Sequence, residues 1–188
     1  MNLPNLITVG RLILTVVCFG CVEARRANGE PLWAWIAFGL FIFAALTDFV
    51  DGYLARRLGQ VTQFGRIADP FADKILVCGA MVLLVEFPMT AAYLPSWIVV
   101  VILGREFLVT TLRAAAEAAG HPFPADRLGK WKMVLQCVAV AGLLSLLAGS
   151  FVFEWVTIVS VWASLALTLV SGANYIARAR RMLAGGGG

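Results

Sequence analysis

The chain has 188 residues, of which 61% are hydrophobic and only 14% are charged, and its mean hydropathy is +0.87. Soluble domains carry about 25% charged residues, so this composition argues against a soluble globular protein and predicts that lipid surrounds much of the chain. A transmembrane helix needs about 20 mostly apolar residues. Residues 133–153 and 155–177 meet that requirement outright.

In chain order, polar or Gly- and Pro-containing breaks divide the sequence into six predicted helices, at residues 5–26, 32–57, 66–86, 93–118, 127–149 and 154–180. Arg11 interrupts the first apolar stretch and no clear cleavage site follows, so we interpret this stretch as a membrane helix rather than a signal peptide. We expect an all-α polytopic membrane protein with six transmembrane helices. Residues 1–184 would form one domain, and residues 185–188 a flexible glycine tail.

The basic residues predict the orientation of these helices. Six helices joined by short loops place both termini and the second and fourth loops on one side. Thirteen of the fifteen Lys and Arg residues, all except Arg25 and Arg26, belong to that side or to the adjoining helix ends. By the positive-inside rule, this side faces the cytoplasm. We therefore expect a multi-pass protein of the cell inner or plasma membrane, with its termini and active site cytoplasmic.

Four aspartates interrupt the apolar pattern where the second predicted helix ends and the third begins. A charge at the bilayer centre costs about 2.5–3.5 kcal/mol, so these carboxylates are expected to face a polar cavity. At about 100° per residue, Asp48 and Asp51 lie some 60° apart on one helix, while Asp69 and Asp73 stack on one face of the next. Such an oxygen-rich group selects Mg²⁺ or Mn²⁺. Two such ions suit displacement at phosphorus.

Small and basic residues accompany these aspartates. Gly52 and Ala55 share the helical face of Asp48 and Asp51, and Gly52 and Gly65 have no side chain to keep a bulky nucleotide from the backbone. Arg56 can neutralise a phosphate.

The whole pattern, D-x-x-D-G-x-x-A-R-x8-G-x3-D-x3-D, extends from Asp48 to Asp73. It resembles the signature of the CDP-alcohol phosphatidyltransferase family, and every fixed position is matched. The resemblance implies six transmembrane helices, a homodimer and a site open to the cytoplasm. It also implies that Asp48 and Asp69 bridge two metal ions, that Asp51 binds one and Asp73 the other, and that Asp73 is the general base. The residues it assigns to binding CDP-diacylglycerol are Asn5, Thr8, Gly52, Ala55, Arg56, Thr62 and Gly65.

Similarity beyond this signature points to a branch of the family whose acceptor is glycerol 3-phosphate. It covers residues 4–11, Gly104-Arg105-Glu106 with Arg113, and Gly129-Lys130-Trp131-Lys132. A dianionic acceptor requires a cationic pocket, for which the candidates are Arg105, Arg113, Lys130 and Lys132. Because a straight helix places Lys130 and Lys132 about 160° apart, we expect only one of them to reach the phosphate and favour Lys130.

The predicted reaction converts CDP-diacylglycerol and glycerol 3-phosphate into phosphatidylglycerophosphate and CMP. Within the family, a cardiolipin synthase or an inositol-phosphate transferase remains an alternative. A divalent-cation transporter is an alternative of another class, because carboxylates within membrane helices also line ion paths. We expect the bilayer and a second copy of the chain as partners, and no nucleic acid.

Overall fold

The computed structural model describes the backbone of residues 3–58, 63–118 and 127–185, and the side chains of residues 8–47, 71–116 and 129–179. Every regular element in these ranges is a helix, which confirms the predicted all-α fold. The helices are α1 (Leu3–Asn28), α2 (Pro31–Leu58), α3 (Gln63–Leu84), α4 (Pro88–Ala91), α5 (Ser96–Ala118), α6 (Arg127–Leu147) and α7 (Glu154–Gly185).

The six predicted helices correspond to the six long helices, with ends that differ by a few residues. The short helix α4 was not predicted. It lies between the predicted helices 66–86 and 93–118, and a proline begins it. Proline suits the first position of a helix because its fixed φ is helical and its missing N–H would have no partner there.

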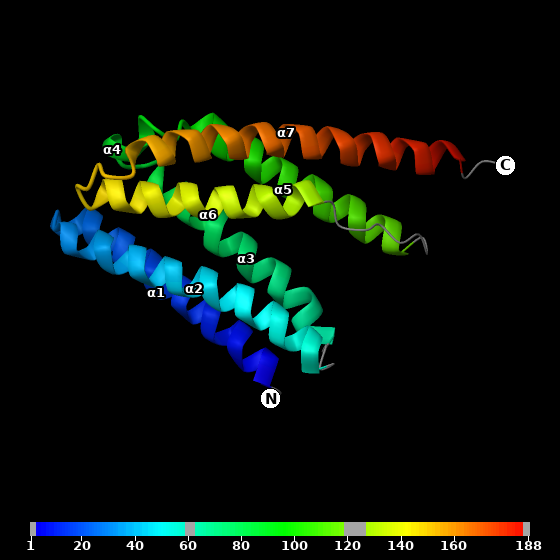
Figure 1. Ribbon diagram of the computed structural model, residues 1–188, viewed down its shortest axis with the longest axis horizontal. Coiled ribbons are helices and arrows are strands. Elements are labelled where there is room, and N and C mark those ends of the chain that lie inside the picture. Colours follow the sequence, from blue (N-terminus) through cyan, green and yellow to red (C-terminus); the bar gives the residue numbers. More distant parts are fainter. Residues whose placement is uncertain (1–2, 59–62, 119–126, 186–188) are drawn as a thin grey trace.

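The long helices form a bundle of two packed pairs, which are joined through α3 and through a direct contact of α2 with α6 (Figure 1). Helix α1 packs along α2, and α6 packs along α7. Helix α3 contacts α1, α5 and α6, while α5 packs against α7. This arrangement brings the middle of α3 close to both α1 and α5, where several of the predicted site residues lie.

Close packing between the helices depends on small residues. A Cβ added to Gly142 on α6 would lie 2.0 Å from the hydroxyl oxygen of Thr157 on α7. A Cβ added to Gly79 on α3 would lie 2.4 Å from the ring of Phe19 on α1. Small residues at such positions let helix backbones approach closely, which is typical of helix contacts in membranes.

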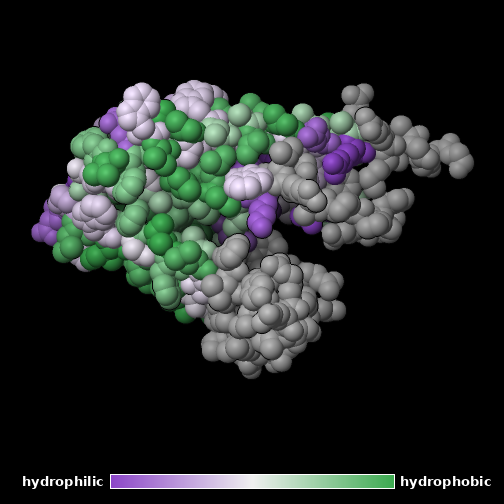
Figure 2. Space-filling model, in the orientation of Figure 1, coloured by the Kyte–Doolittle hydropathy of each residue, from purple (hydrophilic) through white to green (hydrophobic). Residues whose placement is uncertain are grey.

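Helix α7 has polar residues inside and large apolar residues outside. Ser160, Ser164 and Thr168 are buried, and each hydroxyl donates a hydrogen bond to a carbonyl of its own helix, at 3.0, 2.8 and 2.6 Å. By contrast, Trp155 is 78% exposed and Trp162 is 51% exposed. In Figure 2, hydrophobic residues cover most of the described surface and hydrophilic ones gather toward its ends. An apolar exterior of this kind suits a lipid environment.

Two helices in the described part of the chain are long and apolar enough to cross a membrane, Gly129–Leu147 and Glu154–Ala179. The apolar part of α2, Pro31–Thr47, is shorter. These helices support the predicted membrane location. The number of crossings remains a prediction.

Candidate active site

An ion pair joins α1 to α3 in the interior of the bundle. Nη1 of Arg11 lies 2.5 Å from Oδ1 of Asp73, and the Arg11 side chain is only 2% exposed. Thr8 and Thr15 are also buried. They lie on the same face of α1 because they are three residues before and four residues after Arg11. One polar face of α1 is therefore turned toward α3.

The other predicted carboxylates lie on α2 and α3. The backbone of α2 includes Asp48 and Asp51, and that of α3 includes Asp69. Their side chains fall outside the described residues. Among the side chains that are described, no three His, Cys, Asp or Glu residues converge, so the metal site stays a prediction.

Most predicted contacts to CDP-diacylglycerol also fall outside the described side chains. Gly52, Ala55 and Arg56 belong to the last turns of α2, and Gly65 to the first turn of α3. Asn5 belongs to the first turn of α1. Thr62 lies outside the described residues altogether, and Thr8 has the buried position given above.

A second charged group lies where α5 meets α6. Oε1 of Glu106 is 3.1 Å from Nη1 of Arg105 and also contacts Nζ of Lys132 on α6. The side chains of all three residues are nearly buried. Two cations from different helices therefore share one carboxylate oxygen.

Helix α7 holds Arg105 from its other side. Nη2 of Arg105 donates a hydrogen bond to the hydroxyl of Ser171, and the guanidinium lies 5.5 Å from the ring centre of Tyr175. A Cβ added to Gly172 would lie 3.3 Å from Cγ of Arg105. A cation over an aromatic face is attracted to it, so α7 fixes the direction of this side chain.

Lys74 connects this charged group to Asp73. Its ammonium donates a hydrogen bond to the hydroxyl of Thr110 on α5. The charges of Arg105, Arg113 and Asp73 all act on it. We refer to Lys74, Arg105, Arg113 and Lys132 as the basic cluster. Its members belong to α3, α5 and α6, and Lys74 directly follows Asp73, the residue predicted to be the base.

Arg113 carries an unsatisfied donor. Its Nε is buried and has no hydrogen-bond partner among the described residues. Buried donors nearly always have a partner, so this atom is suited to a ligand oxygen. The amide nitrogen of Gln136, on α6 one turn after Lys132, is in the same condition.

The two predicted lysines of α6 differ in burial. Lys132 is buried against Glu106, whereas Lys130 is exposed. They point in different directions, as the helical geometry predicted. However, Lys132 rather than Lys130 lies beside Arg105, and this placement shifts our prediction to Lys132.

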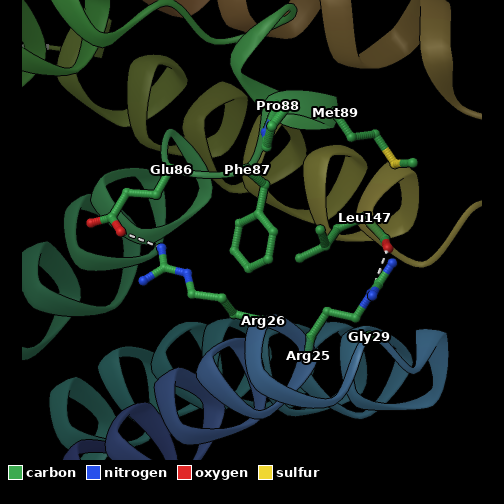
Figure 3. Close-up of a pocket in the computed structure, with 8 residues that line it drawn as sticks. All are labelled: Arg25, Arg26, Gly29, Glu86, Phe87, Pro88, Met89 and Leu147. Atoms are coloured by element: carbon green, nitrogen blue, oxygen red, sulfur yellow. Dashed lines mark hydrogen bonds and ion pairs between the residues drawn. The ribbon is translucent and has the colours of Figure 1, made fainter.

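A cleft of about 510 Å³ lies at the far end of the bundle, where α1, α3 and α6 end (Figure 3). There Arg25 donates a hydrogen bond of 3.3 Å to the carbonyl of Leu147, and Arg26 pairs with Glu86. No predicted site residue lines this cleft. These contacts tie the end of α1 to the ends of α3 and α6.

A sequence model of the CDP-alcohol phosphatidyltransferases matches residues 1–170. The chain belongs to the CDP-alcohol phosphatidyltransferase family. A relative from Bacillus subtilis, named CDP-diacylglycerol–glycerol-3-phosphate 3-phosphatidyltransferase, is 38% identical over 94% of each chain. A Pseudomonas fluorescens relative of the same name is 39% identical over 94% of this chain and 89% of its own. A probable phosphatidylglycerophosphate synthase from Mycobacterium tuberculosis is 35% identical over 98% of this chain and 84% of its own.

The structure adds residues to the candidate site of this CDP-alcohol phosphatidyltransferase that sequence reasoning had not assigned to it. These are Arg11, Lys74, Glu106, Gln136, Ser171 and Tyr175. Gln136 could have been found from its spacing, because it follows Lys132 by four residues and shares its helical face. Ser171 and Tyr175 had no such signal, since only the packing of α7 on α5 brings them to Arg105.

Proposed function

We propose that this protein transfers the phosphatidyl group of CDP-diacylglycerol to glycerol 3-phosphate, forming phosphatidylglycerophosphate and CMP. The observation that carries the proposal is the basic cluster beside Asp73. Lys74 directly follows Asp73, a carboxylate that can accept a proton, and the other three cations lie on α5 and α6, which pack against α3, so the cluster supports binding of an anionic acceptor there. The names of the relatives from Bacillus subtilis and Pseudomonas fluorescens describe the same reaction.

The acceptor phosphate would bind to Arg105, Arg113 and Lys132. Arg113 offers the buried Nε that has no partner among the described residues. Arg105 is already held by Ser171 and Tyr175, so little side-chain entropy would be lost when it binds a phosphate oxygen. Hydrogen bonds between cationic donors and phosphate are among the strongest in proteins.

Asp73 would accept the proton of the acceptor hydroxyl. The hydroxyl oxygen then attacks the phosphorus that carries the diacylglycerol, the bond from that phosphorus to the CMP oxygen breaks, and CMP leaves. Arg11 holds one oxygen of the Asp73 carboxylate, so the base has a fixed position relative to α1. A positioned base typically contributes about 10²–10⁴-fold to rate.

The four aspartates have the donor chemistry of a site for Mg²⁺ or Mn²⁺, because carboxylate oxygens are the ligands these hard cations prefer. Asp48, Asp51, Asp69 and Asp73 would hold two ions. When bound, the ions would supply positive charge for the diphosphate and for the CMP leaving group. The two described elements that carry these residues, α2 and α3, contact one another.

The donor would lie along α1, α2 and α3. Asn5, Thr8, Gly52, Ala55, Arg56, Thr62 and Gly65 would contact its CDP moiety, and the acyl chains would remain in the bilayer. We further propose that six helices cross the membrane, that both termini and the active site face the cytoplasm, and that the protein is a homodimer. The distribution of basic residues supports this orientation.

The decisive experiment incubates the purified protein with CDP-diacylglycerol, Mg²⁺ and radiolabelled glycerol 3-phosphate, then measures label in the lipid fraction and release of CMP. We expect both, with Asp73→Asn as the inactive control. CMP release only with phosphatidylglycerol would indicate a cardiolipin synthase. Release only with inositol phosphate would indicate the corresponding transferase. Divalent-cation flux into proteoliposomes without CMP release would indicate a transporter.

A further inference from the structure

Glu106 occupies an unusual place for a carboxylate. It contacts two cations of the basic cluster, yet it has no part in the proton transfer or in the predicted metal site. Its side chain is 12% exposed, and the same oxygen, Oε1, contacts both Arg105 and Lys132. A single anionic atom thus joins a cation from α5 to a cation from α6.

Lys132 depends on this contact more than Arg105 does. Arg105 is also held by Ser171 and Tyr175. For Lys132, Glu106 is the only hydrogen-bond acceptor among the described residues. The charges of Arg105 and Lys74 both act on Lys132, and like charges at short range repel strongly where water is scarce. Without Glu106, nothing in the described structure would keep the Lys132 ammonium beside Arg105.

We propose that Glu106 is a positioning residue for the acceptor, which holds Lys132 next to Arg105 so that both cations reach one phosphate group. This inference rests on the proposed function, because it assumes that the acceptor carries a phosphate. Glu106 touches neither substrate in this proposal and acts only through the two cations. Its role is to keep the pocket assembled before the acceptor arrives.

The test measures steady-state kinetics for Glu106→Gln, Glu106→Asp and a control, Glu86→Gln. Glu86 also forms an ion pair with an arginine, but it lies at the far end of the bundle. For Glu106→Gln we expect the KM for glycerol 3-phosphate to rise about tenfold or more, because hydrogen bonds to charged groups are strong. The KM for CDP-diacylglycerol should stay within about twofold of the wild-type value, because Glu106 does not contact CDP-diacylglycerol in this proposal. Glu106→Asp should recover part of the loss, and the control should show none.

A double-mutant cycle tests whether Glu106 acts through Lys132. In the Lys132→Met background, Glu106→Gln should add little to the KM for glycerol 3-phosphate, since residues in one network are not additive. A full additional rise, an unchanged KM in Glu106→Gln, or equal rises for both substrates would overturn the proposal. If Glu106→Gln is not recovered folded, an unchanged KM in Glu106→Asp overturns it. Failure of the proposed function is distinct, because the wild-type protein would then not use glycerol 3-phosphate.

Discussion

Nη1 of Arg11 on α1 lies 2.5 Å from Oδ1 of Asp73 on α3, and the arginine side chain is almost completely buried. This pair fixes the proposed base against the first helix of the bundle. The α1–α3 contact therefore includes two charges inside a largely apolar protein. Removing one partner of a buried ion pair typically costs about 3–5 kcal/mol.

We therefore expect Arg11→Met to lower the thermal unfolding midpoint of the detergent-solubilised protein markedly. Methionine keeps much of the side-chain length but has no charge, so the ion pair between residue 11 and Asp73 is lost. The double variant Arg11→Met/Asp73→Asn should be less destabilised than the sum of the single variants, because both charges are then absent. Additive losses would show that the pair contributes nothing specific.

Arg113→Ala tests the acceptor pocket. Because its buried Nε has no partner among the described residues, we expect this donor to bind the acceptor phosphate. The substitution should raise the KM for glycerol 3-phosphate much more than the KM for CDP-diacylglycerol. Steady-state kinetics with each substrate varied in turn would measure both values. Equal rises, or no rise, would remove Arg113 from the pocket.

Removal of divalent cations tests the four aspartates together. We expect the protein to lose activity in EDTA and to regain it when Mg²⁺ or Mn²⁺ is added, because carboxylate clusters bind such ions. CMP release is measured before and after chelation. Protein kept in the same detergent without EDTA is the control for stability. Full activity after exhaustive chelation would contradict the two-metal interpretation.

The sequence predicted the long helices well because apolar runs and their polar breaks determine where membrane helices begin and end. It also predicted that Asp73 faces a polar cavity and that Arg105 belongs to a cationic pocket. It could not show which partner each cation contacts. The pairing of Lys132 with Glu106 and of Arg105 with Ser171 depends on how α5, α6 and α7 pack. The preference for Lys130 illustrates this limit, since helical spacing separates Lys130 from Lys132 but does not indicate which one faces α5.

Packing between α6 and α7 gives a prediction about stability. A Cβ at residue 142 would lie 2.0 Å from the Thr157 hydroxyl oxygen, so Gly142→Ala should destabilise the protein by about 1–3 kcal/mol, the usual cost of overpacking. Gly20→Ala is the matched control, because no heavy atom lies within 4 Å of an added Cβ there. Thr157→Ala in the Gly142→Ala background should recover part of the loss. Thermal unfolding in detergent would compare the four proteins.

The role of Asp73 is tested by comparing it with Asp48. Asp73→Asn keeps the size of the side chain and one ligating oxygen, but it removes the charge and most of the basicity. If Asp73 is the base, turnover should fall by about 10²–10⁴-fold, while affinity for CDP-diacylglycerol largely survives. Asp48→Asn should differ, because the loss of a ligand predicted to bridge both ions should weaken metal and nucleotide binding together.

Turnover and CDP-diacylglycerol affinity should therefore be measured for both variants at saturating Mg²⁺. Structural damage must be checked as well, because Asp73→Asn also removes the negative charge that contacts the buried guanidinium of Arg11. The unfolding midpoint of each variant must accompany its kinetics, so that a fall in turnover is compared with the loss of folded protein. If folded Asp73→Asn retains more than about a tenth of wild-type turnover, with chemistry shown to be rate-limiting, Asp73 is not the base.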